Sequence, residues 1–318
     1  MSYATPSLMP SFQRPPSRVA IRRAASYESD LAQIVYESLV EFDLGERVKG
    51  KKVLLKPNFV GIGSEVAANT HPSLVAAARE SFLRAGAASV VIGEGPALER
   101  DTEAILEELR LREYLGRFDD VFVDLNVDDV HTVALRTRAS SLKRLWLPAT
   151  VLGSDFVVSM PKLKTHHWAG VTLSLKNMFG IVPGLCYGWP KNILHWAGIS
   201  KAVLDLNSTV RPDFAIVDGI VGMEGNGPVQ GEPKAAGVLI LGDDPVAVDA
   251  TATRVMKLQP ERVDYLHDAG ILLGNLSEQK IGQIGERISD VAQSFRVVPE
   301  FEHLRATTKS LPAGSVRA

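Results

Sequence analysis

The sequence predicts an α/β protein with a mostly parallel sheet and helices on both faces. Short, continuously apolar runs alternate with longer segments of helical periodicity, most regularly between residues 18 and 125. Apolar residues make up 45% of the 318 residues and charged residues 23%, as in a globular chain with a large buried core. No run of about 18 apolar residues occurs, so we expect no transmembrane helix and no membrane partner.

The first half of the chain alternates predicted strands and helices. Strands are expected where apolar residues are continuous, and helices where they recur every three or four positions. The strands are expected at 18–22, 53–55, 89–92 and 121–125, and the helices at 27–44, 72–85 and 102–115. Pro72 fits the first turn of its helix, where proline is tolerated. The less regular, basic residues 131–148 indicate an excursion or a domain boundary.

The second half continues the pattern. Strands are expected at 156–159, 214–217 and 238–241, and helices at 171–179, 193–207 and 245–258. Asp244 before Pro245 is typical of an N-cap followed by proline at the first helical position. We expect two α/β lobes, residues 18–150 and 151–305, with a crevice between them, and a flexible arm and tail at 1–17 and 306–318.

The composition argues against several classes of function. The net charge of −2 provides no positive field for a nucleic-acid backbone, so we expect no nucleic-acid partner. The single cysteine, Cys186, cannot form an intrachain disulfide or a four-cysteine iron–sulfur cluster. One thiol and the absence of a signal-peptide pattern predict a cytoplasmic location.

Polar residues follow nearly every predicted strand. In open α/β sheets ligands bind beyond the carboxyl ends of the strands, so we expect these residues to line one crevice. They are Lys56 with Asn58, Glu94, the run 162–167, Asp218, and Asp243 with Asp244.

The stretch from Met160 to Lys201 contains no aspartate or glutamate. Its cations are Lys162, Lys164, Lys176, Lys191 and Lys201, joined by His166, His167 and His195. This density predicts a pocket for a carboxylate or phosphate, and a solvated basic surface is the alternative. Lys176 lies in an otherwise apolar helix, where burial would lower its pKa and make it a base or nucleophile. The alternative is a lysine that extends from the helix flank into water.

Several motifs resemble one known family. They are Lys56-Pro57-Asn58, the runs 161–166 and 174–180, Asp218-Gly219-Ile220 with the run 223–228, and the run 242–249. Together they resemble the domain-of-unknown-function family number 362, over roughly Val19 to Gly274. The resemblance implies no general reaction. Some members look like iron–sulfur proteins because they carry a ferredoxin-type cysteine module, which this chain lacks.

A weaker resemblance concerns one stretch. His167-Trp168-Ala169-Gly170, then Lys176, Pro183-Gly184 and His195, is similar to the active-site stretch of nickel-pincer lactate racemases. The resemblance implies a lysine that carries a cofactor, and histidines that act as acid, base or metal ligand. This chain departs from it at Ser174 and Leu175, where those enzymes have paired glycines.

A divalent metal is an open alternative. Neighbouring residues of a strand or helix point in different directions, so at most one of His166 and His167 is expected beside His195. With Asp218 or Glu224 these would form a set of two histidines and one carboxylate. The metal ligands would be His195, His166 and Asp218.

The resulting hypothesis is an enzyme that moves protons on a small anionic molecule, of isomerase or lyase type. The expected catalytic residues are Lys176, His166, His167 and His195. The expected substrate-binding residues are Lys56, Asn58, Glu94, Lys162, Lys164, Asn177, Asp218, Glu224, Asn226, Asp243 and Asp249. The alternative is an accessory protein for a metal centre or redox partner, as the iron–sulfur relatives suggest.

Overall fold

The computed structural model describes residues 14–61, 67–98, 100–116 and 120–305. The strands are β1 Ser17–Arg23, β2 Lys52–Lys56, β3 Ser89–Glu94, β4 Phe122–Asp124, β5 Val130–Val133, β6 Leu145–Pro148, β7 Phe156–Ser159, β8 Lys162–His166, β9 Gly170–Thr172, β10 Phe214–Glu224, β11 Glu232–Gly242 and β12 Ile281–Gly285. The α-helices are α1 Leu31–Glu41, α2 Leu44–Val48, α3 Pro72–Arg84, α4 Thr102–Glu108, α5 Leu111–Leu115, α6 Ala149–Leu152, α7 Ser174–Asn177, α8 Gly184–Tyr187, α9 Asn192–Trp196, α10 Ile199–Thr209, α11 Pro245–Val255, α12 Asp264–Leu272 and α13 Ile288–Val291. Short 3-10 helices span Met178–Ile181, Pro260–Arg262, Glu278–Lys280 and Pro299–Leu304.

One ten-stranded sheet runs through the molecule in the order β12-β1-β11-β10-β7-β2-β3-β4, and β8 with β9 branches from β10. Most neighbouring strands are parallel. The exceptions in the main order are the pairs that β11 makes with β1 and β10, which are antiparallel. The predicted fold class, α/β with a mostly parallel sheet, is therefore confirmed.

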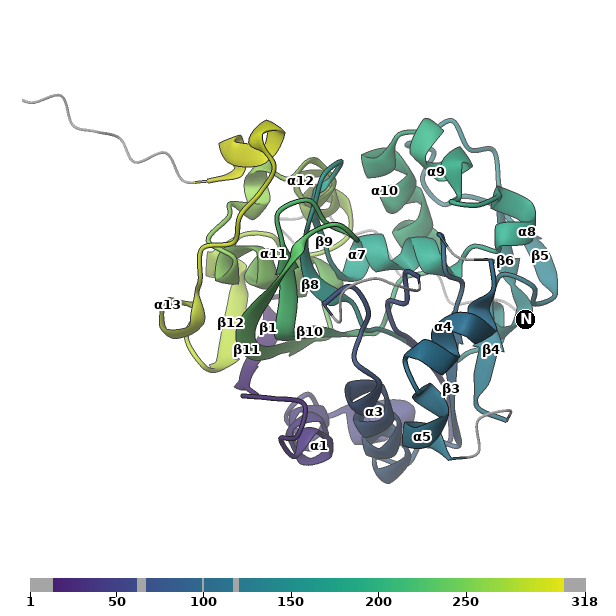
Figure 1. The fold of residues 1–318 in the computed structure, drawn as a ribbon, viewed down its shortest axis with the longest axis horizontal. Coiled ribbons are helices and arrows are strands. Elements are labelled where there is room, and N and C mark those ends of the chain that lie inside the picture. The colour runs from purple at the N-terminus through teal and green to yellow at the C-terminus, as the bar shows by residue number, and fades with distance from the viewer. Residues whose placement is uncertain (1–13, 62–66, 99, 117–119, 306–318) are drawn as a thin grey trace, which may run out of the picture.

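Helices cover both faces of the sheet. Figure 1 shows α1, α3 and α5 on one side and α7, α10, α11 and α12 on the other. Each side buries its own apolar cluster, because the strands between them are apolar on both faces. In α3, for example, Leu74, Ala78 and Phe82 recur at helical spacing and are fully buried against the sheet side of the molecule.

Several predicted elements differ from the observed ones. The helix expected at 102–115 is broken into α4 and α5 at Arg110, whose backbone is left-handed (φ 53°). The helix expected at 193–207 is broken at Gly198, where φ is 93°. The helix expected at 171–179 begins instead with β9. Strands β10 and β11 extend well beyond the predicted 214–217 and 238–241 and form a long antiparallel hairpin.

The sheet is continuous across residue 150, where we expected the boundary between two lobes, because β7 pairs in parallel with β2. The two-lobed arrangement stays a prediction. The arm expected at 1–17 is too long, since the Arg14 guanidinium donates to the carbonyls of Gly270, Ile271 and Gly274. Residues 1–13 and the tail 306–318 lie outside the described residues. Within the described part of the chain, no helix has the length and hydropathy needed to cross a bilayer.

Candidate active site

A cavity of about 390 Å³ opens at the carboxyl ends of β2 and β3, beside the turn that joins β8 to β9. We call it the lysine–histidine cavity. The parallel strands β2, β3 and β8 end toward the same edge, which brings their terminal residues together. Ten residues that the sequence placed at the site line it: Lys56, Asn58, Glu94, Lys164, His166, His167, Lys176, Asn177, His195 and Asn226.

A buried ion pair between Lys56 and Glu94 forms the floor of this cavity. The Lys56 Nζ lies 2.7 Å from both carboxylate oxygens of Glu94, and each residue is only 1% exposed. The same amine donates to Asn177 Oδ1 at 3.0 Å, while Glu94 also accepts the backbone N–H of Phe59 at 2.9 Å. Burial lowers the pKa of Lys56, and the Glu94 charge opposes that shift. The Lys56 amine thus bonds both Glu94 and Asn177, so these three side chains stabilise the structure of the site.

Gly180 closes over this pair. A Cβ at position 180 would collide with the Lys56 Nζ and a Glu94 carboxylate oxygen. Only glycine allows the backbone to pass this close to the ion pair. The glycine therefore positions the residues after α7 directly above the floor of the cavity.

Two further lysines are buried beside the pair and donate to carbonyl groups. Lys164 Nζ donates to Ala68 O at 2.8 Å, and Lys191 Nζ donates to Gly95 O at 2.6 Å. Burial lowers the pKa of Lys191 to about 7. Burial and then the charge of Lys162 lower the pKa of Lys164 well below its ordinary value.

Lys176 differs from these lysines in having a free amine. Within the described residues, its Nζ forms no hydrogen bond or ion pair. The Nζ lies 4.8 Å from the centroid of the Phe179 ring, in a cation–π contact. The residue is 9% exposed and lines the cavity. Burial lowers the pKa of Lys176 to about 8. Its amine is therefore available to a ligand and titrates near neutral pH.

Asp249 of α11 fixes the short helix that carries Lys176. Its carboxylate accepts the backbone N–H groups of Ser174 at 2.8 Å and Leu175 at 3.0 Å, at the start of α7. Burial raises the pKa of Asp249 to about 8, although these hydrogen bonds oppose the shift. We predicted that Asp249 binds substrate, and this was wrong. Its side chain is buried in the core and caps a neighbouring helix.

The hydrogen bonds of the three histidines assign the nitrogen atom that carries each proton. His166 Nδ1 accepts the Trp168 backbone N–H at 2.9 Å, so in the neutral ring Nε2 carries the proton. His167 Nδ1 lies 2.6 Å from Gly227 O, and His195 Nδ1 lies 3.3 Å from Lys191 O. A carbonyl only accepts, so each of these rings, when it is neutral, keeps its lone pair on Nε2.

Burial, followed by the charge of Lys176, lowers the pKa of both His166 and His195. Both rings are therefore neutral at pH 7. One offers an N–H and the other a lone pair, which is the pairing of donor and acceptor that proton transfer requires.

His166 and His167 both line the cavity, which contradicts the expectation that at most one would. The reason is local. His166 is the last residue of β8 and His167 begins the turn, so the alternation of a strand no longer separates them. Their ring centroids are 5.0 Å apart.

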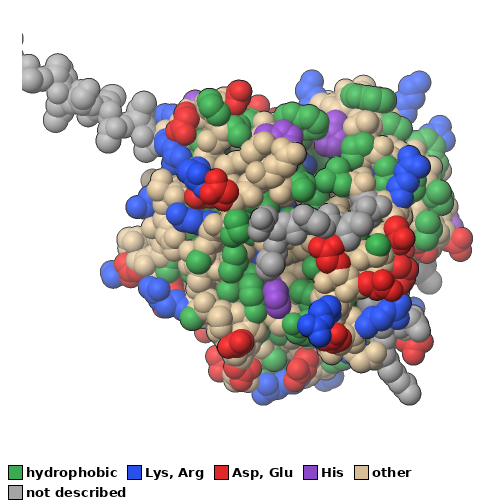
Figure 2. Space-filling view, in the orientation of Figure 1, with side chains coloured by type: hydrophobic (Ala, Val, Ile, Leu, Met, Phe, Trp, Pro, Cys, Tyr) green, Lys and Arg blue, Asp and Glu red, His purple; other side chains and the backbone are tan. Residues whose placement is uncertain are grey.

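The walls and mouth of the cavity are apolar. The apolar residues lining it are Phe59, Val60, Ala97, Leu98, Trp168, Phe179, Pro190, Pro228 and Val229. The Trp168 ring is 61% exposed and lies between His167 and His195, with centroid distances of 4.7 and 5.5 Å. Figure 2 shows histidine side chains at the surface over the β8–β9 turn and over α9, with hydrophobic side chains around them. The cavity therefore combines apolar walls with the free amine of Lys176.

Lys162 and Asp218 do not reach the cavity. The Lys162 Nζ lies 2.8 Å from an Asp218 carboxylate oxygen, and both side chains are fully buried. The Tyr27 hydroxyl contacts both groups. The sequence suggested that a strand ends at Val217, but β10 continues to Glu224. Asp218 therefore lies inside the strand, in register with Lys162 of β8.

Glu224 and Asp243 are also placed elsewhere. Glu224 accepts the Arg296 side chain at 2.8 Å and its backbone N–H at 3.0 Å. Asp243 lies 3.2 Å from an Arg47 nitrogen, at the opposite edge of the sheet. We expected Asp243 at the crevice because we read β11 as parallel, whereas β11 is antiparallel and ends at the other edge.

The predicted metal ligands do not come together. Asp218 is held by Lys162, far along β10 from the histidines of the cavity. Across the described residues, no group of three or more histidine, cysteine, aspartate or glutamate side chains is arranged to hold a metal ion.

Sequence reasoning did not assign Lys191 or Trp168 to the site. A signal existed for both, because they belong to the same acid-free stretch as the predicted lysines. Lys191 lies in a loop rich in proline, glycine and tryptophan, with a left-handed backbone (φ 64°). That local conformation turns its side chain inward, which residue spacing alone does not indicate.

Comparisons with known proteins show a family and a relative from Synechocystis. Residues 53–254 match the family described as domain of unknown function, DUF362. A thylakoid-associated protein from Synechocystis sp. is 30% identical over 257 residues, which cover 77% of this chain and 76% of that protein.

Two solved structures are similar to this chain at a lower sequence identity. The lactate racemase apoprotein from Thermoanaerobacterium thermosaccharolyticum gives a TM-score of 0.44 with 14% identity, over 76% of this chain and 57% of that one. A protein from Thermotoga maritima gives a TM-score of 0.42 with 14% identity, over 70% of this chain and 58% of that one. The chain thus spans less than two thirds of either of these structures.

Proposed function

The chain belongs to the DUF362 family, and on that premise we propose that it is an enzyme that moves a proton on a small carboxylate or phosphate. The observation that carries the proposal is the free amine of Lys176 beside neutral imidazoles in a largely apolar cavity. An isomerase or lyase needs these parts: a cation for the anionic end of the substrate, and a base near neutral pH.

In this proposal Lys176 binds the anionic end of the substrate. With a pKa of about 8, its amine is mostly charged at pH 7, and no partner among the described residues neutralises it. In an apolar cavity a charged amine attracts a carboxylate or phosphate more strongly than it would in water. The other three lysines that line the cavity already donate to protein oxygens.

In this proposal His195 is the base that takes the proton from the substrate. Its Nε2 carries the lone pair, and its Nδ1 is oriented by the Lys191 carbonyl. His166 presents an N–H and is suited to return a proton or to polarise a carbonyl group. His167 has the same tautomer as His195 and is the second candidate for the base.

The alternative that we drew from the sequence, an accessory protein for a metal centre or redox partner, gains no support from the described side chains. Cys186 is the only cysteine, and no trio of metal-ligating side chains is assembled among the residues that the structure describes. The cytoplasmic location stays a prediction, since the Synechocystis relative is by its name associated with thylakoids.

Hydrogen–deuterium exchange on candidate substrates tests the proposal without knowledge of the product. The protein is incubated in D₂O with 2-hydroxy acids, 2-oxo acids and phosphorylated sugars, and proton NMR follows the loss of carbon-bound hydrogen. We expect exchange on at least one compound, slowed about 100-fold or more by His195→Gln. His267→Gln is the matched control, because His267 is exposed and pairs with Asp268 away from the cavity. Absence of exchange on the whole panel, or equal exchange in both variants, contradicts the proposal.

A further inference from the structure

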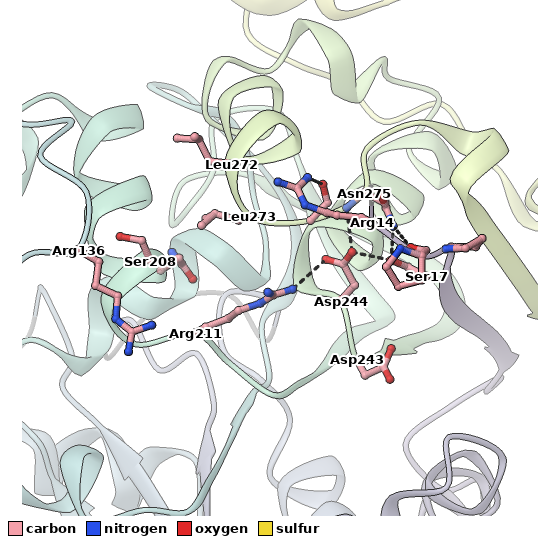
Figure 3. A pocket seen from close by; sticks show the side chains of 14 residues that line it. Arg14, Ser17, Arg136, Ser208, Arg211, Asp243, Asp244, Leu272, Leu273 and Asn275 are labelled. Atoms are coloured by element: carbon pink, nitrogen blue, oxygen red, sulfur yellow. Dashed lines mark hydrogen bonds and ion pairs between the residues drawn. The ribbon is translucent and has the colours of Figure 1, made fainter. Parts of the chain in front are cut away.

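A second cavity, of about 320 Å³, lies where β1 and β10 begin and β11 ends. We call it the arginine cavity. It is lined by Arg14, Pro15, Pro16, Ser17, Arg136, Asn207, Ser208, Arg211, Asp243, Asp244 and the run 272–275. Figure 3 shows Arg136 and Ser208 on one side, Arg14, Ser17 and Asn275 on the other, and Arg211 between them. No residue of the lysine–histidine cavity lines it.

The carboxylates of this cavity are already satisfied. Asp244 accepts the Ser17 hydroxyl at 2.6 Å and the backbone N–H groups of Val246 and Asn275, which is its role as N-cap of α11. Asp243 is paired with Arg47. Neither acid is therefore free to neutralise the arginines fully.

Two of the three arginines lack a close partner. Arg14 is used in capping the end of α12. Arg211 approaches Asp244 only to 3.9 Å, which is beyond hydrogen-bond distance. Within the described part of the chain, no hydrogen bond or ion pair joins the Arg136 guanidinium, and Arg136 is only partly exposed. Guanidinium groups remain charged at any ordinary pH, so the three arginines outnumber the two carboxylates that line the cavity, and its net charge is positive.

An acceptor without a partner lies in the same wall. Asn207 is fully buried, and its amide nitrogen donates to the carbonyls of Leu175 and Val203, both at 2.8 Å. Its Oδ1 has no hydrogen-bond partner among the described residues. A buried acceptor left unpaired costs about 1–3 kcal/mol, but this oxygen has no solvent-accessible surface, so the arginines are the groups that face a ligand.

We propose that the arginine cavity binds a small oxyanion, either a carboxylate or a phosphate. Arg136 and Arg211 hold the oxyanion, for which a planar guanidinium offers paired N–H donors. This site lies at the other edge of the sheet from the proposed catalytic cavity and does not depend on the proposed reaction.

Calorimetric titration of the full chain tests the site, with inorganic phosphate, glycolate and acetate as probes and sodium chloride to match ionic strength. We expect glycolate or phosphate to bind, and the dissociation constant to rise about tenfold or more in both Arg136→Gln and Arg211→Gln. Because the other cavity is also proposed to bind such anions through Lys176, the titrations are repeated in Lys176→Met, where the binding that remains is expected to belong to the arginine cavity.

Three results would overturn the proposal. They are no binding of any probe at concentrations up to about 10 mM, unchanged affinity in both arginine variants, or loss of all binding in Lys176→Met alone. Binding of phosphate but not glycolate would identify a phosphate site. Because Arg136 is partly exposed and forms no ion pair among the described residues, its variant folds even if Arg211→Gln does not.

Discussion

The two cavities at opposite edges of the sheet are similar in volume, about 390 and 320 Å³, but hold different kinds of positive charge. The first contains buried lysines whose pKa values are lowered, to about 8 for Lys176 and about 7 for Lys191. The second contains arginines, which keep their charge. A group that titrates near neutral pH can move a proton, whereas a permanent charge can only bind and orient. The comparison therefore supports the proposals of chemistry in the first cavity and of anion binding in the second.

The position of each cavity in the sheet explains this difference. The lysine–histidine cavity lies at the ends of strands that are buried on both faces, so its charges are removed from water. The arginine cavity lies between a helix end, loops and the first residues of β1 and β10, where Arg211 is 34% exposed. Arg136 and Arg211 are consequently less desolvated than the lysines of the first cavity, whereas Arg14 is buried.

The largest effect is expected when one partner of the buried pair in the first cavity is removed. Lys56→Met leaves the Glu94 carboxylate buried without its cation, which costs about 3–5 kcal/mol of the free energy of unfolding. Urea denaturation measures this loss. The double variant Lys56→Met/Glu94→Gln, which buries no charge at this position, is expected to recover part of it.

An exposed ion pair provides the control for this prediction. Arg110 and Glu113 are both largely exposed, so Arg110→Gln is expected to cost much less than Lys56→Met. A loss below about 1 kcal/mol in Lys56→Met would mean that the pair is not desolvated as the structure indicates. The contrast between buried and exposed charge would then fail.

Much of this arrangement could be predicted from the sequence, because it follows from local patterns. Continuous apolar runs located β2, β3 and β7, and parallel strands of this kind carry their ligands at their carboxyl ends. That rule placed Lys56, Asn58 and Glu94 correctly at the first cavity.

The direction of β11 could not be read from the same patterns. An apolar run looks identical in a parallel and an antiparallel strand, so Asp243 was assigned to the wrong edge. Strand β8 was missed because it carries Lys162, Lys164 and His166, which in isolation resemble a polar loop. Its burial depends on partners such as Asp218 that are distant in sequence.

The cap of α7 connects the core to the first cavity only, and its removal is expected to have the second-largest effect. Asp249→Ala leaves two backbone N–H groups buried without an acceptor, so we expect a loss of about 2 kcal/mol. The amine of Lys176 is also expected to become more exposed, and its pKa to return toward 10.5. Acetic anhydride labelling of Lys176 at several pH values, followed by mass spectrometry, measures that pKa.

Asp30→Ala is the matched control, because Asp30 caps α1 by accepting the Gln33 N–H on the other side of the sheet. It is expected to reduce stability by about 1 kcal/mol and to leave the labelling of Lys176 unchanged. If both cap variants change the labelling alike, Asp249 has no specific positioning role.

Lys176→Met is expected to increase stability at pH 7, by roughly 1 kcal/mol or more, since one pKa unit corresponds to about 1.4 kcal/mol. Below pH 8 the amine is charged in both the folded and the unfolded chain, and the folded chain bears the cost of burying it. Between pH 8 and 10.5 the unfolded chain holds more protons, so the stability of the wild type rises with pH. The advantage of the variant should therefore shrink across this window.

Urea denaturation of both proteins at pH 7, 9 and 10.5 measures this difference, and Lys201→Met is the exposed control. A constant difference at the three pH values would show that Lys176 titrates normally. Its assignment as the anion-binding group with a lowered pKa would then be wrong.

The smallest effect is expected in the second cavity. Arg136→Gln removes a guanidinium that is partly exposed and that no described residue holds in a hydrogen bond or ion pair, so the free energy of unfolding should change by less than about 0.5 kcal/mol. Arg14→Gln is the contrasting variant, because Arg14 is buried and donates to three carbonyls at the end of α12. Its loss should exceed that of Arg136→Gln by about 1–3 kcal/mol. Equal losses in urea denaturation would mean that Arg136 supports the fold. A small loss of unfolding free energy in Arg136→Gln would mean that the Arg136 guanidinium contributes positive charge to the cavity but little to the stability of the fold.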